Sequence, residues 1–214
     1  MSDPYYASRY VWDKDRATVW REIVRYLSPY LASAETIVDL GAGYCDFINN
    51  VSAEKRIAVD WSSDFMRFAA NGVQTLQSAV TDLGKIETSS ADVVLASNLL
   101  EHLTDDELGQ VMTEVRRVLA AGGVFIAMQP NYRYAYKTYF DDPTHKKVFS
   151  DEALRQFLVS HGFEIMLVKP KFLPFSMNSR PSFIPLHPLV VRAYLRSPMK
   201  PFAGQMLFVT RVIK

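Results

Sequence analysis

The chain has 214 residues, of which 49% are hydrophobic and 22% are charged, and its formal net charge is +1. This composition fits one globular domain with elaborations and excludes a largely disordered chain. A single cysteine excludes an internal disulfide and a cysteine-based zinc site. The first residues lack a secretory signal pattern, and the longest near-apolar stretch, 118–128, is far shorter than the roughly 18 residues of a membrane span. We therefore expect a cytoplasmic protein.

Charge is unevenly distributed along the chain. Residues 1–129 hold 11 Lys and Arg against 18 Asp and Glu, a net charge of −7, whereas residues 130–214 hold 13 against 5, a net charge of +8. Nine of the 11 prolines also lie between Pro130 and Pro201. The chain therefore changes near Pro130 from an acidic, regularly patterned part to a basic part rich in proline and aromatic residues.

The hydrophobic pattern alternates between helical and strand periodicity. The continuous apolar run 91–97 indicates a strand covered on both faces, and Thr104 with Glu107 forms a capping box at the start of a long helix. In chain order, the predicted elements are a helix over 13–30, a strand over 36–40, a short helix over 46–51, a strand over 56–60, a helix over 62–70, strands over 73–79 and 91–97, a helix from 104 that ends before 122, a strand over 124–128, a helix over 150–161, and strands over 163–168 and 205–212.

This order predicts an α/β, Rossmann-like fold. Strands that alternate with helices form a mainly parallel sheet with right-handed crossovers, here seven strands with helices on both faces. No clearly patterned helix joins the last two strands, so we expect them to pair antiparallel at one edge.

The turn after the first predicted strand carries the main functional signal. In an open parallel sheet, ligands bind beyond the carboxyl ends of the strands. Asp39 and Leu40 are followed there by Gly41-Ala42-Gly43, whose glycines let the backbone approach a ligand, and the next helix offers free amides to an anion. Asp60, at the end of the second strand, can accept hydrogen bonds from both hydroxyls of a ribose, or it caps the following turn.

The same turn distinguishes two classes of nucleotide. A dinucleotide fingerprint would place a third glycine at position 46, where this chain has Asp46. A carboxylate would repel a pyrophosphate there, whereas S-adenosylmethionine (SAM) carries no phosphate. The turn therefore favours SAM over a nicotinamide dinucleotide.

With these features the chain resembles the class I SAM-dependent methyltransferases, in the group that acts on small molecules and lipid precursors. The resemblance covers about residues 35–130 and departs from the family at Cys45, where a third glycine is common. The matching segments are 38–43, Asp60, 81–83, 96–103 and 115–123.

The resemblance implies SAM as the cofactor and suggests how the chain holds it. Trp61 and Leu83 could equally be plain core residues. The resemblance implies that Gly41, Ala42 and Gly43, backed by Asp39, hold the methionine part of SAM, and that Asp60 binds the ribose. It also implies that Trp61 lies against the adenine face and that Asp82 and the Leu83 amide bind the adenine edge. Asn98 would lie near the methyl group.

Two histidines are candidates for a general base. Methyl transfer needs a nucleophile held in line with the methyl group, and a hydroxyl acceptor also benefits from a base. His102 follows the fourth strand, and His145 lies in an Asp-Pro-Thr-His turn that is similar to a loop in methyltransferases of cell-surface glycan assembly. We favour His145, interpret Glu101 as a structural residue of the rim, and expect no metal site.

A single methyltransferase domain is expected over residues 1–214. It comprises an N-terminal lid and helix over 1–34, a SAM-binding core over 35–130, and an acceptor-side insertion with the last helix and edge strands over 131–214. The basic segment 169–201 either caps the sheet or contacts an anionic membrane surface, in which case the protein would be peripheral at the inner membrane surface.

The expected reaction is O-methylation of a small-molecule, glycan or lipid-linked acceptor, including an anionic one, by in-line displacement. An RNA methyltransferase and a non-catalytic SAM-binding scaffold are the alternatives. The nearly neutral chain and the absence of an Asn/Asp-Pro-Pro-aromatic motif after the fourth strand argue against nucleic acid as the partner. The sequence leaves the oligomeric state open.

Overall fold

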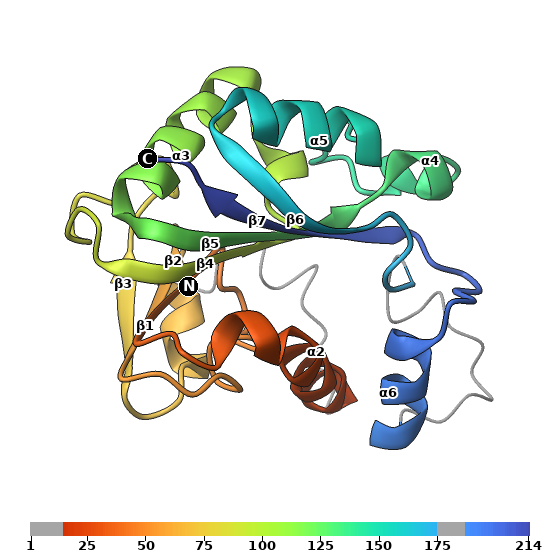
Figure 1. Ribbon diagram of the computed structural model, residues 1–214, viewed down its shortest axis with the longest axis horizontal. Helices are drawn as coiled ribbons and strands as arrows, with labels where there is room; N and C mark the ends of the chain where they lie inside the picture. Colours follow the sequence, from red (N-terminus) through yellow and green to blue (C-terminus); the bar gives the residue numbers. More distant parts are fainter. Residues whose placement is uncertain (1–14, 175–186) are drawn as a thin grey trace.

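The computed structural model describes residues 15–174 and 187–214. They form a central sheet with helices on both faces (Figure 1). Residues 1–14 of the expected N-terminal lid lie outside the described residues, as does part of the basic segment 169–201.

The elements follow the predicted alternation of helices and strands; η marks a 3-10 helix. In chain order they are α2 (Asp15–Leu31), β1 (Thr36–Leu40), β2 (Lys55–Asp60), η1 (Ser63–Phe68), β3 (Val73–Gln77), β4 (Ala91–Ser97), η2 (Leu100–His102), α3 (Asp105–Val118), β5 (Leu119–Pro130), α4 (Tyr132–Ala135), η3 (Tyr139–Asp141), α5 (Asp151–Ser160), β6 (Phe163–Lys169), α6 (Pro188–Arg196) and β7 (Gln205–Val212).

The sheet confirms the predicted seven-stranded, mainly parallel architecture. Its strand order is β3-β2-β1-β4-β5-β7-β6, and β7 runs antiparallel to both β5 and β6. The expected antiparallel pairing of the last two strands is thus confirmed, with β7 lying between β5 and the edge strand β6. The chain reverses its direction of winding between β1 and β4, and a ligand site is expected beyond the carboxyl ends of these two strands.

Helices cover the two faces in pairs, with α3 and α5 on one face and α2 and α6 on the other (Figure 1). On the first face, Val115 of α3 and Leu154 of α5 pack in one core with Phe125 of the sheet. On the second face, Leu27 of α2 belongs to a separate core. The predicted capping box of α3 is confirmed: the Glu107 amide donates to Thr104 Oγ1, and the Glu107 carboxylate accepts from the Thr104 amide.

The predicted helix over 46–51 is wrong, because this segment forms turns. The amide side chains of two asparagines compete with helical hydrogen bonds there. Asn49 donates to the Phe68 carbonyl and accepts from the Ala70 amide, while Asn50 donates to the Asp46 carbonyl. The turns thereby tie the segment to the end of η1, which is a six-residue 3-10 helix in place of the longer helix expected over 62–70.

Strand β5 begins at Leu119, five residues earlier than the predicted start at 124. Its pairing with β4 shifts register between Ala91 and Val93, which indicates a bulge. Gly122 has φ +75° in this stretch, a left-handed conformation that glycine adopts without strain. Gly122 and Gly123, where the predicted helix ends, therefore lie within the irregular first part of β5.

Helix α6 packs against α2 as a cap. Val191 is buried in the second core, while Leu189 is 61% exposed. Arg192 Nε and Nη2 donate to the Glu22 carboxylate at 2.8 and 3.1 Å, and Glu22 is only 2% exposed. The arginine therefore compensates a buried acid. No helix among residues 15–174 and 187–214 is long and apolar enough to cross a membrane.

Candidate functional site

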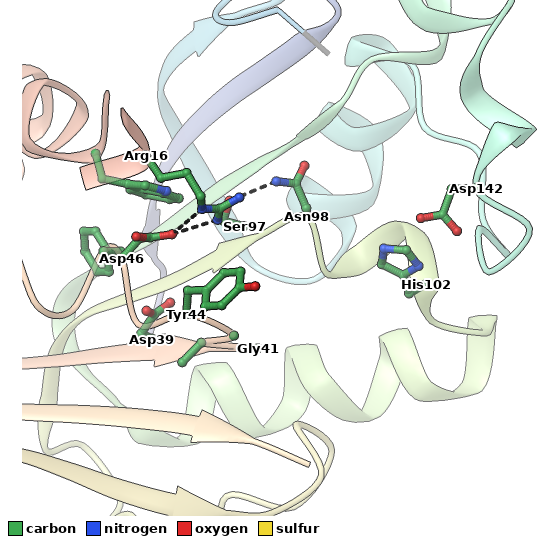
Figure 2. A pocket seen from close by; sticks show the side chains of 13 residues that line it. Arg16, Asp39, Gly41, Tyr44, Asp46, Ser97, Asn98, His102 and Asp142 are labelled. Carbon is green, nitrogen blue, oxygen red and sulfur yellow. Dashed lines mark hydrogen bonds and ion pairs between the residues drawn. The ribbon is translucent and has the colours of Figure 1, made fainter. Parts of the chain in front are cut away.

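A cavity of about 230 Å³ lies at the carboxyl ends of β1 and β4 (Figure 2). Arg16 and Asp46 stand at one end, His102 and Asp142 at the other, and Asn98 lies between them. The residues that line it are Arg16, Trp20, Asp39, Gly41, Ala42, Gly43, Tyr44, Asp46, Phe47, Ser97, Asn98, His102 and Asp142.

The glycine turn folds tightly over the end of β2. The amides of Gly41 and Ala42 both donate to the Val59 carbonyl, at 2.9 and 3.1 Å. Gly41 has φ +67°, and a Cβ there would lie 3.1 Å from Leu99 Cδ1, so a larger residue would be strained and crowded. Gly41, Ala42 and Gly43 of this turn line the cavity wall.

Cys45, which stands where the family often has glycine, adopts φ 57°. The left-handed backbone explains why glycine is common at this position. Its thiol is buried against the Phe65 carbonyl, and burial raises the pKa of Cys45 to about 12. The thiol therefore stays protonated at neutral pH, which removes it as a nucleophile.

Asp60 joins the glycine turn to the end of β2. Its Oδ2 accepts from the Gly43 amide at 3.0 Å and its Oδ1 accepts from the Ser62 amide at 3.1 Å. The residue is 4% exposed. Each carboxylate oxygen can accept more than one hydrogen bond, so this structural role is compatible with the predicted ribose contact.

Acidic groups and one arginine face each other at the end of the cavity beside the glycine turn. Asp39 is buried behind the turn, and burial, with Asp60 and Asp46 adding to it, raises its pKa. The Arg16 guanidinium pairs with Asp46 Oδ2 at 2.7 Å from Nη2 and 2.8 Å from Nε. Burial raises the pKa of Asp46 although Arg16 opposes the shift. This end of the cavity therefore offers partners of both signs.

Asn98 follows β4 with φ 50°, an uncommon conformation for a residue other than glycine. The backbone amide of Asn98 donates to the Met128 carbonyl at 2.7 Å, and the side-chain Oδ1 accepts from Gln205 Nε2 at 2.9 Å. Such backbone conformations persist where the surrounding structure holds them, and they concentrate at functional sites. The side chain is thus fixed in the middle of the cavity.

The residues predicted to contact adenine lie apart from the cavity lining. Trp61 is 56% exposed, whereas Leu83 is buried. Asp82 is exposed, and its Oδ1 accepts from the Gly84 amide at 3.0 Å. The Leu83 amide donates to Glu114 Oε2 at 2.8 Å, so a ligand atom at that amide would share it with the glutamate.

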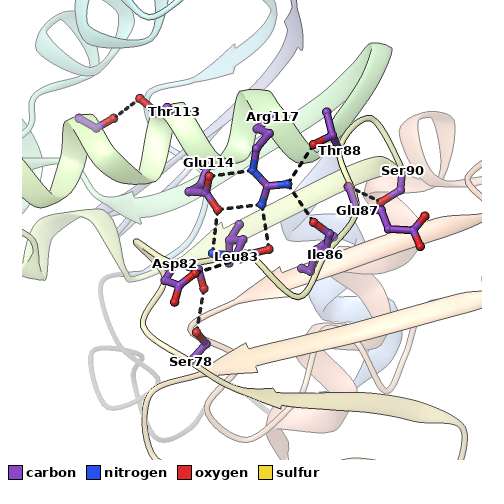
Figure 3. A network of polar contacts seen from close by, with 12 residues as sticks. Ser78, Asp82, Leu83, Ile86, Glu87, Thr88, Ser90, Thr113, Glu114 and Arg117 are labelled. Atoms are coloured by element: carbon purple, nitrogen blue, oxygen red, sulfur yellow. Dashed lines mark hydrogen bonds and ion pairs between the residues drawn. The ribbon is translucent and has the colours of Figure 1, made fainter.

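An ion pair on α3 holds the loop that carries Asp82 and Leu83 (Figure 3). Arg117 donates to the carbonyls of Leu83 and Ile86 at 2.8 and 2.9 Å and to the Glu114 carboxylate at 2.8 Å. These hydrogen bonds lower the pKa of Glu114 and keep it charged. Sequence patterns gave no sign of this network, because its members come from two segments about 30 positions apart.

We expect Arg117→Leu to lower the free energy of unfolding by about 2–4 kcal/mol, because it removes several hydrogen bonds to a charged donor. Urea denaturation would measure the change. The matched control is Arg116→Leu, since Arg116 is exposed on the same helix and hydrogen-bonds the Ile213 carbonyl at 3.3 Å. Equal losses for the two variants would contradict this role of Arg117.

At the acceptor end, the structure places the two candidate histidines side by side but in different positions. Their ring centroids are 4.8 Å apart. His102 lines the cavity, whereas the His145 side chain is 4% exposed and is absent from the lining. The sequence favours His145 as the base, whereas in the structure His102 is the histidine that lines the cavity.

The tautomer of each histidine follows from its partners. His145 Nδ1 lies 2.6 Å from the Tyr139 carbonyl, which can only accept, so Nδ1 carries the proton. His102 Nδ1 lies 2.9 Å from Thr144 Oγ1 and 3.3 Å from the Thr144 carbonyl. Because Thr144 Oγ1 donates its hydrogen to Asp142 Oδ1 at 2.7 Å, His102 Nδ1 must also be the donor. In both rings Nε2 then bears the lone pair.

Glu101 combines a structural main chain with an uncompensated side chain. Its carbonyl accepts from the amides of Lys146 and Lys147 at 2.8 and 3.0 Å, which fastens the insertion to η2. Its carboxyl group is fully buried, and neither oxygen has a hydrogen-bond partner among the described residues. Burial, with the charge of Asp142 adding to it, raises the pKa of Glu101 to about 8. A purely structural interpretation of Glu101 does not explain this side chain.

Several lining residues escaped sequence reasoning. Arg16, Trp20 and Tyr44 reach the cavity only because α2 packs beside the glycine turn, which no local pattern reveals. Asp142 belongs to the same turn as His145, and that proximity was the one available signal.

Comparison with known proteins agrees with this geometry. A family pattern described as a methyltransferase domain matches residues 38–127. No match was found among curated proteins.

Solved structures share the fold at low sequence identity. A SAM-dependent methyltransferase from Archaeoglobus fulgidus is 19% identical, with a TM-score of 0.71 over 98% of this chain and 100% of that chain. A possible histamine N-methyltransferase from Thermotoga maritima is 19% identical, with a TM-score of 0.67 over 93% and 92%. The N-methyltransferase NodS from Bradyrhizobium japonicum, solved with S-adenosylhomocysteine, is 12% identical, with a TM-score of 0.63 over 100% and 94%.

The family match covers Val38 to Leu40 of β1, the glycine turn and the whole of β4, and ten of the 13 residues that line the cavity lie within it. The strand order is that of the class I fold, and SAM is the cofactor of this class. Residues 38–127 therefore match a methyltransferase domain, and the chain has the fold of the class I SAM-dependent methyltransferases.

Proposed function

We propose that the protein transfers the methyl group of SAM to an oxygen atom of a small-molecule, glycan or lipid-linked acceptor. The observation that carries this proposal is the single cavity that runs from the glycine turn to His102 and Asp142. It offers a cofactor end and a proton-accepting end in one continuous space. Exclusion of water from such a space favours displacement in line over hydrolysis.

The residues at the methionine end fit the charges of SAM. Arg16 suits the carboxylate of the methionine part, and Asp46 and the buried Asp39 suit its ammonium group. The glycine turn provides room that side chains would fill, and Asp60 stands beside it for the ribose. Trp61, Asp82 and the Leu83 amide remain the proposed adenine contacts.

When bound, SAM supplies a methyl group on a positively charged sulfur that is ready for displacement. The chain's own task is to hold the acceptor in line and to manage its proton. We propose that His102 accepts the acceptor proton at Nε2, because its Nδ1 is already protonated and bound to Thr144. His145 would then be a positioning residue, packed against the His102 ring.

An amine acceptor is the second candidate. Two of the similar solved structures are described as N-methyltransferases, one of them as a possible histamine enzyme. The acceptor end carries the carboxylate of Asp142, which would attract a cationic amine. His102 could deprotonate such an amine before transfer.

Calorimetry with S-adenosylhomocysteine tests the cofactor site. Arg16→Leu is expected to weaken binding by about tenfold or more, because it removes a charge-assisted hydrogen bond to the carboxylate. Arg21→Leu is the matched control, since Arg21 lies exposed on the same helix. Failure of the folded wild-type protein to bind S-adenosylhomocysteine would overturn the proposal.

The acceptor class requires a second measurement. Methyl transfer from labelled SAM would be followed over a panel of phenols, sugars, lipid-linked sugars and amines, with mass spectrometry to locate the new methyl group. Oxygen-linked products support the first candidate, and nitrogen-linked products replace it with the second. Cofactor binding with no turnover on any acceptor would favour a SAM-binding scaffold.

A further inference from the structure

Three side chains with metal-binding atoms meet behind the acceptor end of the cavity. Glu101, His102 and His145 each contribute a carboxylate or imidazole atom, and these atoms lie within 4.8 Å of one another. The first two belong to η2, and the third belongs to the insertion after β5. Carboxylate and imidazole together are typical ligands of zinc and other divalent transition metals.

Both imidazoles are oriented as they are in metal sites. A histidine that binds a metal usually donates its other ring N–H to a carbonyl or to a group linked to a carboxylate, which fixes the ring and its tautomer. His145 donates in this way to the Tyr139 carbonyl, and His102 donates to Thr144. Thr144 is in turn hydrogen-bonded to the Asp142 carboxylate. In each ring the lone pair is therefore on Nε2.

The carboxyl group of Glu101 supplies the independent indication of a ligand. It is fully buried, and within residues 15–174 and 187–214 neither of its oxygens meets a hydrogen-bond donor. Burying such a group without a partner is unfavourable by several kcal/mol on the order-of-magnitude scale for polar groups, and native proteins rarely tolerate it. A cation would provide the missing partner for one or both oxygens.

Asp142 brings a second acid to the same place. Its Oδ2 lies 3.9 Å from His145 Nε2, and the residue also lines the cavity. We propose that Glu101, His102 and His145, with Asp142 beside them, bind a divalent transition metal ion at the acceptor end of the cavity. In tetrahedral coordination, ligand atoms about 2.1 Å from the ion lie about 3.4 Å apart. The widest pair, at up to 4.8 Å, therefore needs to close by about 1.4 Å.

Such an ion would change how the acceptor proton is handled, a consequence that rests on the proposed function. A metal beside a hydroxyl group lowers the pKa of that hydroxyl and so favours its deprotonation. In the metal-bound protein His102 Nε2 would be a ligand, so its proposed role as the proton acceptor applies to the metal-free protein. Metal binding itself does not depend on the identity of the acceptor.

Metal uptake by the full-length protein is the direct test. The protein would be stripped with a chelator and titrated with Co²⁺, followed by visible absorption, and with Zn²⁺, followed by elemental mass spectrometry and thermal unfolding. We expect one equivalent of metal per chain and a rise in the unfolding temperature. Glu101→Gln and His145→Gln should each weaken uptake by about 10–100-fold.

His161→Gln is the matched control, because His161 lies on another surface with its Nδ1 against the Phe157 carbonyl. It should retain the full equivalent of metal. Circular dichroism would establish that each variant is folded, and His145→Gln carries the test if Glu101→Gln does not fold. No uptake by the wild type, or equal uptake by wild type and folded variants, would overturn the site.

Calorimetry with S-adenosylhomocysteine on the same samples separates this inference from the proposed function. Cofactor binding without metal uptake would overturn the metal site and leave the methyltransferase proposal intact. Metal uptake without cofactor binding would support the metal site and overturn the methyltransferase proposal.

Discussion

Replacing Asp60 with asparagine is expected to weaken the binding of S-adenosylhomocysteine by about 100-fold and to lower the unfolding free energy by about 2–4 kcal/mol. The carboxylate accepts hydrogen bonds from the amides of Gly43 and Ser62 while nearly fully buried. In the asparagine variant, the side-chain NH2 group would face one of these two backbone N–H groups, so that hydrogen bond would be lost. The glycine turn would therefore shift, and one proposed partner of the ribose would be lost.

A matched variant separates the loss of binding from the loss of stability. Asp92 Oδ2 accepts from the amides of Glu35 and Thr36 at 2.8 and 2.9 Å, at the opposite end of the sheet. Asp92→Asn should also lower stability but leave the affinity for S-adenosylhomocysteine unchanged. Calorimetry and urea denaturation would be run on both variants. If Asp60→Asn bound the ligand as tightly as Asp92→Asn does, Asp60 would not belong to the cofactor site.

His102→Ala is expected to lower kcat by about 100- to 10,000-fold, the usual contribution of a general base, with little change in cofactor affinity. The side chain lines the cavity at the end away from the glycine turn, so its removal leaves the cofactor end intact. Steady-state rates with a hydroxyl acceptor and calorimetry with S-adenosylhomocysteine would give the two quantities.

The comparison with His145 makes this prediction specific. His145→Ala should lower kcat less than His102→Ala, because the His145 side chain is buried behind the cavity wall and acts through its neighbour. His161→Ala should leave the rate unchanged. A larger loss for His145→Ala than for His102→Ala would return the catalytic role to His145, as the sequence first suggested.

Local signals predicted most of the fold. The β-branched and apolar runs located all seven strands, and the Thr104 and Glu107 pair located the start of α3, since both depend on neighbouring residues. The prediction failed over 46–51, where Asn49 and Asn50 bond to the backbone more favourably than a helix would allow. Side-chain competition of this kind is decided by tertiary partners, which a sequence window does not contain.

The site was only partly predictable for the same reason. A glycine turn at a strand end is a local feature and predicted Gly41 and Gly43, whereas Asn98 was suggested only by the family resemblance; all three line the cavity. Arg16 and Asp142 lie on the cavity wall through packing between distant segments. The uncompensated carboxyl of Glu101 could not be foreseen at all, because burial without a partner is a property of the folded environment and not of the residue type.

The position of β7 imposes an order of assembly on the growing chain. The strand is the last of the seven along the chain, yet it lies between β5 and β6. Until residues 205–212 have been synthesised, β6 has no strand to pair with. The edge of β5 is also unpaired and can associate with other nascent chains. A truncation before residue 205 would therefore remove the pairing partner of both β5 and β6 and leave the edge of β5 exposed.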